Sequence, residues 1–218
     1  MSTRERILEA SLTLFNASGE RNVTTNHIAA NLGISPGNLY YHFKNKQAII
    51  FELFDRYEQR VMQVLALPEG RAIETTDKLR YLMEVFQGLW EYRFMHRDME
   101  HLLKADPVLH ERYRNFFRYC LNQIEAIFRA VNDAGIIRAD ERDCRDLALN
   151  TWILVTSWFS FLHCNLLGAD DAEISEDMLR GGIYQVFSLE RPYLTEEHRA
   201  SVEELQRQFI PRPSWLEI

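Results

Sequence analysis

The chain has 218 residues, which is long enough for a small domain beside a larger one with its own core. Its formal net charge of −7 excludes a protein that coats nucleic acid over its whole surface. The charge is uneven, however. Residues 1–47 carry five Lys or Arg against three Glu, a net of +2, and the rest carry 20 against 29, a net of −9. This division is typical of a protein that binds DNA with one end.

The segment TTNHIAANLGISPGNLYYHFKNKQ, residues 24–47, carries the strongest functional signal. Thr24 or Thr25 can cap a short helix, because a hydroxyl accepts from the free N–H groups of a first turn. Gly33 can adopt the positive φ that ends this helix sharply. Ser35 and Pro36 suit the N-cap and first position of a second helix. The pattern therefore predicts two short helices joined by a tight turn.

The second helix divides its residues between core and surface. Leu39 and Phe43 are four apart and are expected to face inward. Outward positions are left to residues whose side chains can bond base edges or phosphates, among them Asn38, Tyr40, Tyr41 and His42. Lys44 and Lys46 follow, placed to hold a DNA backbone. The segment thus predicts a helix-turn-helix whose second helix enters the major groove.

Residues 4–54, RERILEASLTLFNASGERNVTTNHIAANLGISPGNLYYHFKNKQAIIFELF, strongly resemble the N-terminal domain of the TetR family of bacterial transcriptional regulators. A small departure is Ile49 or Ile50 where leucine is more usual. The resemblance implies an all-α fold with a helix-turn-helix domain at 1–47 and a larger helical effector-binding and dimerisation domain at 48–218. It also implies DNA contacts at eight positions: Thr25, Ser35, Gly37, Asn38, Tyr40, Tyr41, His42 and Lys46.

Helical periodicity continues after residue 47. We expect helices over residues 45–66, Thr76–Met95 and Asp98–Lys104, and one from Pro107 to Gly135. No stretch of the sequence alternates apolar and polar residues for long enough to predict a β-strand.

Residues 147–167 contain no Asp, Glu, Lys or Arg, so that length alone would permit a membrane span. Their polar residues and the lack of a basic flank favour a buried helix instead. Another helix is expected at Ser175–Glu190, where Gly181 and Gly182 indicate close approach of a further helix. By the family resemblance, residues 144–167 and 175–190 pair with their symmetry mates in a homodimer, and a bulky residue at Gly182 would give monomers. A last helix is expected from Thr195 to about Phe209.

Dimerisation has a functional reason, because two helix-turn-helix domains related by a two-fold axis can read a palindromic operator. In the resembled family, a small inducer bound in the C-terminal domain releases the operator. The aromatic residues here would suit an apolar or aromatic inducer, or form an ordinary core. The candidate pocket residues are Phe86, Trp90, Phe94, Phe116, Tyr119, Trp152 and Phe161.

Other classes of function lack their motifs. The sequence has no GxSxG, HExxH, P-loop or GxGxxG, so neither an enzyme nor a cofactor is predicted. His96 and His101 are five apart, the wrong spacing for a metal on one helix face. Three cysteines without CxxC spacing, and no N-terminal signal, indicate a cytoplasmic protein. An activator, a nucleoid-organising protein or a regulator without a ligand remain alternatives to a repressor.

Overall fold

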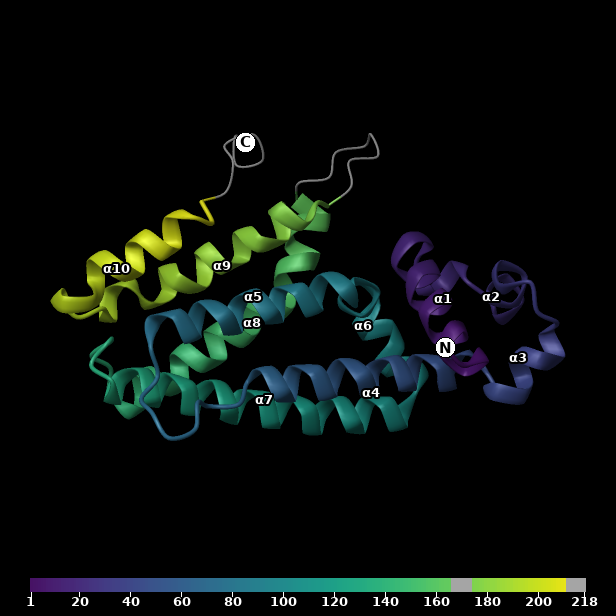
Figure 1. Cartoon of the computed structure of the whole chain (residues 1–218), viewed down its shortest axis with the longest axis horizontal. Helices are drawn as coiled ribbons and strands as arrows, with labels where there is room; N and C mark the ends of the chain where they lie inside the picture. The colour runs from purple at the N-terminus through teal and green to yellow at the C-terminus, as the bar shows by residue number, and fades with distance from the viewer. Residues whose placement is uncertain (166–173, 211–218) are drawn as a thin grey trace. The chain divides into compact units, whose positions relative to one another are not determined.

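The computed structural model describes residues 1–165 and 174–210 (Figure 1). These residues form α-helices joined by turns and short 3-10 segments, and they contain no β-strand beyond one isolated bridge between Ile137 and Leu194. The predicted all-α fold is therefore confirmed. The helices are α1 (Thr3–Ser18), α2 (Thr25–Leu32), α3 (Pro36–His42), α4 (Lys46–Val64), α5 (Thr75–Glu91), α6 (Arg93–Ala105), α7 (Pro107–Asp133), α8 (Glu141–Asn165), α9 (Glu176–Glu190) and α10 (Glu196–Arg207).

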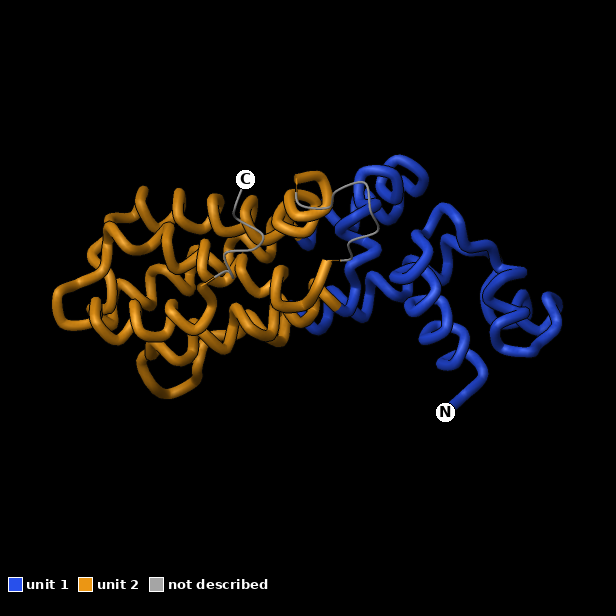
Figure 2. The backbone as a smooth tube through the Cα atoms, turned by 90° about the horizontal axis from the view of Figure 1, so that it is seen from above, with its two compact units in different colours: residues 1–61, 91–116 blue, residues 62–90, 117–218 orange. Residues whose placement is uncertain are grey.

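The chain divides into two compact units (Figure 2). Unit 1 comprises residues 1–61 and 91–116, and unit 2 comprises residues 62–90 and 117–218. Unit 1 thus joins the predicted DNA-binding segment to the first part of α4, to α6 and to the start of α7. The contact-based division differs from the sequence-based boundary at residue 47, because α6 is distant in sequence and close in space.

Asn16 explains how α6 attaches to α1 within unit 1. Its side-chain amide donates to the carbonyl oxygen of Glu91 at 2.7 Å, and its side-chain oxygen accepts from the N–H of Phe94 at 3.1 Å. The Phe15 and Phe94 rings pack beside it, with centroids 5.1 Å apart. One asparagine therefore satisfies backbone groups on both sides of the turn at Tyr92.

The same turn corrects two predicted helix boundaries. A single helix was expected over Thr76–Met95 and a short one over Asp98–Lys104, whereas α5 ends at Glu91 and α6 already begins at Arg93. Tyr92 leaves the helical conformation, with φ −107° and ψ 29°. The apolar periodicity runs on through the turn because Phe94 and Met95 are buried in α6.

In unit 2, α8 and α9 pack against each other along their lengths (Figure 1). Gly182 of α9 is buried, and a Cβ there would lie 2.5 Å from Cζ of Phe86 in α5 and 2.9 Å from Cδ1 of Trp158 in α8. The helix that approaches this glycine therefore belongs to the same chain. The close approach expected at this glycine occurs within the protomer, and a role of Gly182 in subunit contact stays a prediction.

Helix α8 is long and apolar enough, by length and composition, to cross a membrane, and 39% of its most apolar window is buried in the chain. Core helices of soluble proteins share this property. One face packs inside unit 2, whereas Leu149, Ile153 and Phe161 are 41%, 51% and 44% exposed. We call these three residues the α8 stripe. Residues 166 and 167 of the predicted interface lie outside the described residues.

Helix α10 covers part of α9. The buried Gln206 side chain donates to the carbonyl oxygen of Tyr184 at 3.0 Å and to the hydroxyl of Ser188 at 2.7 Å. Thr195 anchors the start of α10, since its hydroxyl donates to the carbonyl oxygen of Gly135 at 2.8 Å. One side of α9 is therefore occupied within the chain, and α8 presents the larger apolar surface to solvent.

Candidate nucleic-acid interface

The first helix of the predicted motif, α2, is capped at both ends. The Thr24 hydroxyl accepts from the N–H of His27 at 3.2 Å, and Nδ1 of His27 accepts from the N–H of Thr24 at 3.4 Å. Gly33 follows the helix with φ 65°, and the N–H of Ile34 returns to the carbonyl oxygen of Ala29 at 3.0 Å. Thr24 rather than Thr25 is the cap, which leaves the Thr25 hydroxyl for other contacts.

The second helix, α3, starts as the sequence predicts. The Ser35 hydroxyl accepts from the N–H of Asn38 at 3.1 Å, and Pro36 occupies the first helical turn. Leu39 is fully buried and Phe43 is 3% exposed, which confirms that both belong to the core. This packing turns the other side chains of α3 outward.

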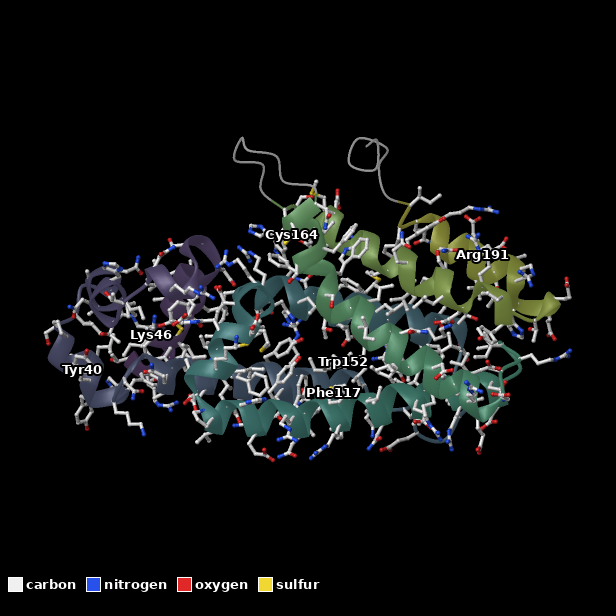
Figure 3. The ribbon with its side chains drawn as sticks, turned by 180° about the vertical axis from the view of Figure 1, so that it is seen from behind. Tyr40, Lys46, Phe117, Trp152, Cys164 and Arg191 are labelled. Carbon is white, nitrogen blue, oxygen red and sulfur yellow. The ribbon has the colours of Figure 1, made fainter. Side chains whose placement is uncertain are left out.

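Most of the predicted DNA contacts lie on the surface of the motif (Figure 3). Tyr41 is 85% exposed and Tyr40 is 49% exposed. Thr25, His42 and Lys46 are partly buried. The predicted positions with exposed residues are Ser35, Gly37, Asn38, Tyr40 and Tyr41.

Thr25 and Tyr40 are joined by their hydroxyls. The oxygen of Thr25 at the start of α2 lies 2.9 Å from the phenolic oxygen of Tyr40 in α3. One hydroxyl must donate to the other, so the pair retains one free hydroxyl hydrogen. Sequence spacing did not indicate this contact, because the two residues are 15 apart and meet only through the turn.

Lys46 makes three contacts inside unit 1. Its Nζ lies 3.0 Å from the carbonyl oxygen of Glu20, 3.1 Å from that of Val23 and 2.6 Å from Oε1 of Glu20. The Glu20 side chain is only 5% exposed, and Nε2 of His101 lies 3.8 Å from its other oxygen. No local pattern predicted that this lysine, expected to contact DNA, would also be the partner of a buried carboxylate.

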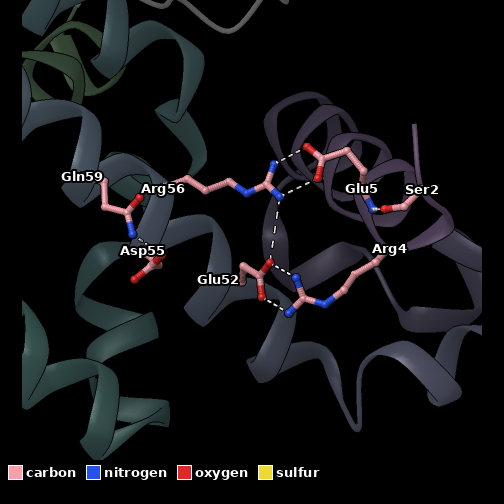
Figure 4. Close-up of polar contacts among 7 residues, drawn as sticks. All are labelled: Ser2, Arg4, Glu5, Glu52, Asp55, Arg56 and Gln59. Carbon is pink, nitrogen blue, oxygen red and sulfur yellow. Dashed lines mark hydrogen bonds and ion pairs between the residues drawn. The ribbon is translucent and has the colours of Figure 1, made fainter.

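A network of ion pairs joins α1 to α4 (Figure 4). Arg56 donates to both carboxylate oxygens of Glu5 at 2.7 and 2.9 Å, and lies 3.9 Å from Glu52. Arg4 in turn donates to both carboxylate oxygens of Glu52 through its two terminal guanidinium nitrogens, Nη1 and Nη2. The Arg56 hydrogen bonds hold the pKa of Glu5 below its usual value. The network fixes the start of α1 on α4 and engages the charge of Arg4.

No cluster of three metal-ligating side chains occurs among the described residues, and His96 and His101 make separate contacts. His96 is buried, with Nε2 3.1 Å from the hydroxyl of Tyr57. Burial lowers the pKa of His96 to about 4, so the imidazole is neutral near pH 7. His96 is a core residue that joins α6 to α4.

The seven candidate pocket residues fall in both units. Phe94 and Phe116 belong to unit 1, and the other five belong to unit 2. Phe161, at 44% exposed, stacks on Trp158 with centroids 5.2 Å apart. Trp152 packs edge-on against Phe117 at 5.3 Å (Figure 3). Pocket contact by any of them stays a prediction.

Unit 2 also contains a buried ion pair that the sequence did not indicate. Lys78 of α5 pairs with Glu190 of α9, and both side chains are at least 95% buried. Lys78 lies 5.5 Å from the centroid of the Phe187 ring. Burial lowers the pKa of Lys78 to about 7, whereas its carboxylate partner favours the charged form. The pair ties α5 to α9.

Comparison with known proteins identifies the family. Residues 7–53 match the family described as bacterial regulatory proteins, tetR family, and residues 56–202 match the TetR family described as bacterial transcriptional repressor. The second match alone spans more than half of the chain. The chain belongs to the TetR family.

A TetR-family transcriptional regulator from Marinobacter aquaeolei VT8 is 50% identical, with a TM-score of 0.89 over 97% of this chain and 100% of that one. SmeT of Stenotrophomonas maltophilia, solved with triclosan, has a TM-score of 0.63 at 23% identity over 90% of this chain and 93% of its own, so this likeness shows the fold alone.

A nucleoid occlusion factor, SlmA of Shewanella woodyi, is 24% identical over 60% of this TetR-family chain and 66% of its own length. Less than two thirds of that relative is therefore matched. The family assignment makes this protein a DNA-binding transcriptional regulator and not an enzyme.

Proposed function

We propose that this TetR-family protein is a homodimeric repressor that binds a palindromic operator in the cytoplasm. The observation that carries the proposal is the outward face of α3. It is held by a buried Leu39 and Phe43 and carries Asn38, Tyr40 and Tyr41 in solvent. Such a face can enter the major groove, where Asn reads adenine and hydroxyls meet phosphates.

The proposed DNA contacts are the eight predicted ones: Thr25, Ser35, Gly37, Asn38, Tyr40, Tyr41, His42 and Lys46. The start of α3, with Ser35 and Gly37 exposed, is suited to approach the backbone closely. The side chains further along the helix reach outward from the same surface.

Homodimerisation is supported by the α8 stripe. Three large apolar side chains between 41% and 51% exposed follow one face of a single helix, Leu149, Ile153 and Phe161. Burying such a face against its symmetry mate removes apolar surface from water. The two helix-turn-helix domains of one dimer then read two half-sites about 34–36 Å apart, or a multiple of that distance.

We propose further that a small apolar or aromatic inducer releases the operator. The aromatic residues of the larger domain are suitable lining, and SmeT, which shares the fold, has been solved with triclosan. Release would follow if the inducer binds the DNA-incompetent state more tightly. The residues proposed for the pocket are Phe86, Trp90, Phe94, Phe116, Tyr119, Trp152 and Phe161.

The test is selection of bound duplexes from a random DNA pool with the purified protein. We expect one palindrome with fixed half-site spacing, matched at few promoters, and increased transcription from those promoters when the gene is deleted. Reduced transcription would indicate an activator. Failure to enrich any sequence with folded, dimeric protein would contradict the operator proposal.

Similarity to nucleoid occlusion factors supports a second candidate, a DNA-binding protein that organises chromosome regions. The two candidates differ in the number and position of their genomic sites. Chromatin immunoprecipitation separates them: many sites spread away from promoters favour the second, and a few promoter sites favour a local repressor.

A further inference from the structure

Two carboxylates lie next to each other on the middle of α4. Asp55 and Glu58 are three residues apart, a spacing that makes side chains neighbours on a helix surface. Their side chains are 34% and 14% exposed, so water and salt screen the repulsion between the two charges only in part. This face of α4 therefore requires a cation from another element.

Arg112 of α7 supplies that cation. Its Nε donates to Oε2 of Glu58 at 2.7 Å, and its Nη2 donates to Oδ1 of Asp55 and to Oε2 of Glu58. The guanidinium carbon lies 4.9 Å from the centroid of the Phe51 ring. A planar guanidinium can bond carboxylates and stack on an aromatic ring at the same time. We call Arg112, Asp55, Glu58 and Phe51 the Arg112 clamp; all four belong to unit 1.

Aromatic packing continues the contact between α4 and α7 beyond the clamp. The buried Phe116 packs edge-on against Phe54, with ring centroids 5.7 Å apart, and the Tyr113 ring lies 6.2 Å from the same ring. Packed rings hold the helices together but are not directional in the way hydrogen bonds are. The charge-assisted hydrogen bonds of Arg112 add geometric specificity to this contact.

Helix α4 is held on another face by α1, through the network of Glu52 and Arg56 described above. That network joins α4 to a helix of the DNA-binding segment itself. The Arg112 clamp instead joins α4 to α7, which runs from Pro107 to Asp133. Because α4 begins only four residues after α3 ends, the direction of α4 governs where the recognition helix lies.

We propose that Arg112 is a positioning residue for operator binding. By fixing the start of α7 on the middle of α4, it restricts the direction of α4, and hence the separation at which the two recognition helices of a dimer meet DNA. Arg112 itself touches no DNA. This inference rests on the proposed binding of a palindromic operator by a homodimer, and it names a residue that makes the half-site spacing selective.

The test measures affinity for the selected palindrome and for two duplexes with one base pair inserted or removed between the half-sites. The ratio of these affinities is the spacing selectivity, and a lower folded fraction leaves it unchanged because it weakens binding to every duplex alike. We expect Arg112→Gln to weaken binding to the selected palindrome and to reduce the spacing selectivity by about fivefold or more. Arg112→Lys keeps the charge without the planar fork and should lose part of the selectivity.

Arg114→Gln is the matched control. Arg114 lies on the same helix, its side chain is 56% exposed, and it pairs with Glu111 of α7 at 3.6 Å. The substitution removes the same charge from α7 without touching α4, so it accounts for long-range electrostatic effects on DNA binding. Its spacing selectivity should equal that of the wild type.

An unchanged selectivity in folded, dimeric Arg112→Gln would overturn the proposal, as would an equal loss in Arg114→Gln or a wild type without spacing preference. If Arg112→Gln does not fold, the double variant Asp55→Ala/Glu58→Ala removes both acceptors of the clamp and should lose selectivity to the same extent; full selectivity there would overturn the proposal too. Failure of the wild type to bind any duplex would instead refute operator binding itself.

Discussion

The hydroxyl pair of Thr25 and Tyr40 joins the two helices of the DNA-binding motif at one point. Because the oxygens are 2.9 Å apart, each hydroxyl orients the other. A phosphate that accepts the one remaining hydroxyl hydrogen would meet a donor already oriented by its partner hydroxyl. The contact therefore links the geometry of the turn at Gly33 to affinity for DNA.

We expect Thr25→Val and Tyr40→Phe each to weaken operator binding, and the double variant to lose less than the sum of the two. The coupling should be about 1 kcal/mol, since residues in one hydrogen-bond network are not additive. Fluorescence anisotropy with labelled operator at fixed salt measures the cycle. Additive losses would show that the hydroxyls act independently.

His96 provides a second residue-scale prediction, in the pH dependence of stability. Its pKa is lowered by burial from 6.5 to about 4. Between these values the unfolded chain binds a proton that the folded chain does not, so stability rises with pH through this window and is fully present above about 6.5. Acidification to pH 4 should cost roughly 3 kcal/mol through this group.

Urea unfolding of the wild type and of His96→Gln, between about pH 4 and 7, isolates this contribution, because the carboxylates titrate in both proteins. The wild type should lose more stability on acidification than the variant does. Parallel curves would show that His96 is protonated in the folded protein, contrary to its burial against Tyr57.

At the scale of elements, Gly182 determines how closely α9 approaches α5 and α8. Gly182→Ala replaces a poor helix former by a good one, which alone would stabilise by about 1 kcal/mol. The added Cβ would lie 2.5 Å from Phe86, however, and overpacking of this kind costs about 1–3 kcal/mol. We therefore expect Gly182→Ala to have a lower melting temperature than the wild type. Sedimentation should show that the variant is still a dimer.

Gln185→Ala on the same helix is the control for that substitution, since Gln185 is only partly buried. It should change the melting temperature little. Dissociation of Gly182→Ala into stable monomers would instead place this glycine at the subunit interface, as its position in the sequence first indicated.

At the scale of the whole molecule, we expect operator binding to depend on the pairing of two copies of the chain. We expect Ile153→Glu, at the middle of the α8 stripe, to give monomers in sedimentation and to lose affinity for the palindrome. A charge there would be buried without a partner in the dimer. Asn122→Glu, on an exposed position of α7, should remain dimeric. A dimeric Ile153→Glu variant would move the interface elsewhere.

The division into two units shows which helices belong with the DNA-binding motif. Unit 1 includes α6, held to α1 by Asn16 and to α4 by the His96–Tyr57 contact. A sequence boundary at residue 47 separates the motif by its local pattern. It could not include α6, because the contacts that attach this helix join residues more than 35 positions apart.

The sequence by itself determined the features that depend on local chemistry. Helical periodicity, the cap at Ser35, a cap at Thr24 or Thr25, the turn at Gly33 and the inward Leu39 all follow from neighbours within a few residues. The matched family pattern made the DNA-binding motif recognisable for the same reason. Helix order and the all-α fold were accessible without coordinates.

Only the tertiary structure decided which groups remain free to act. Lys46 and Lys44 are two residues apart and chemically identical, yet one binds Glu20 and the other has no partner among the described residues. Gly182 likewise faces Phe86, a residue 96 positions away. Partners distant in sequence set charge compensation and close packing, and no local pattern records where the fold will bring them.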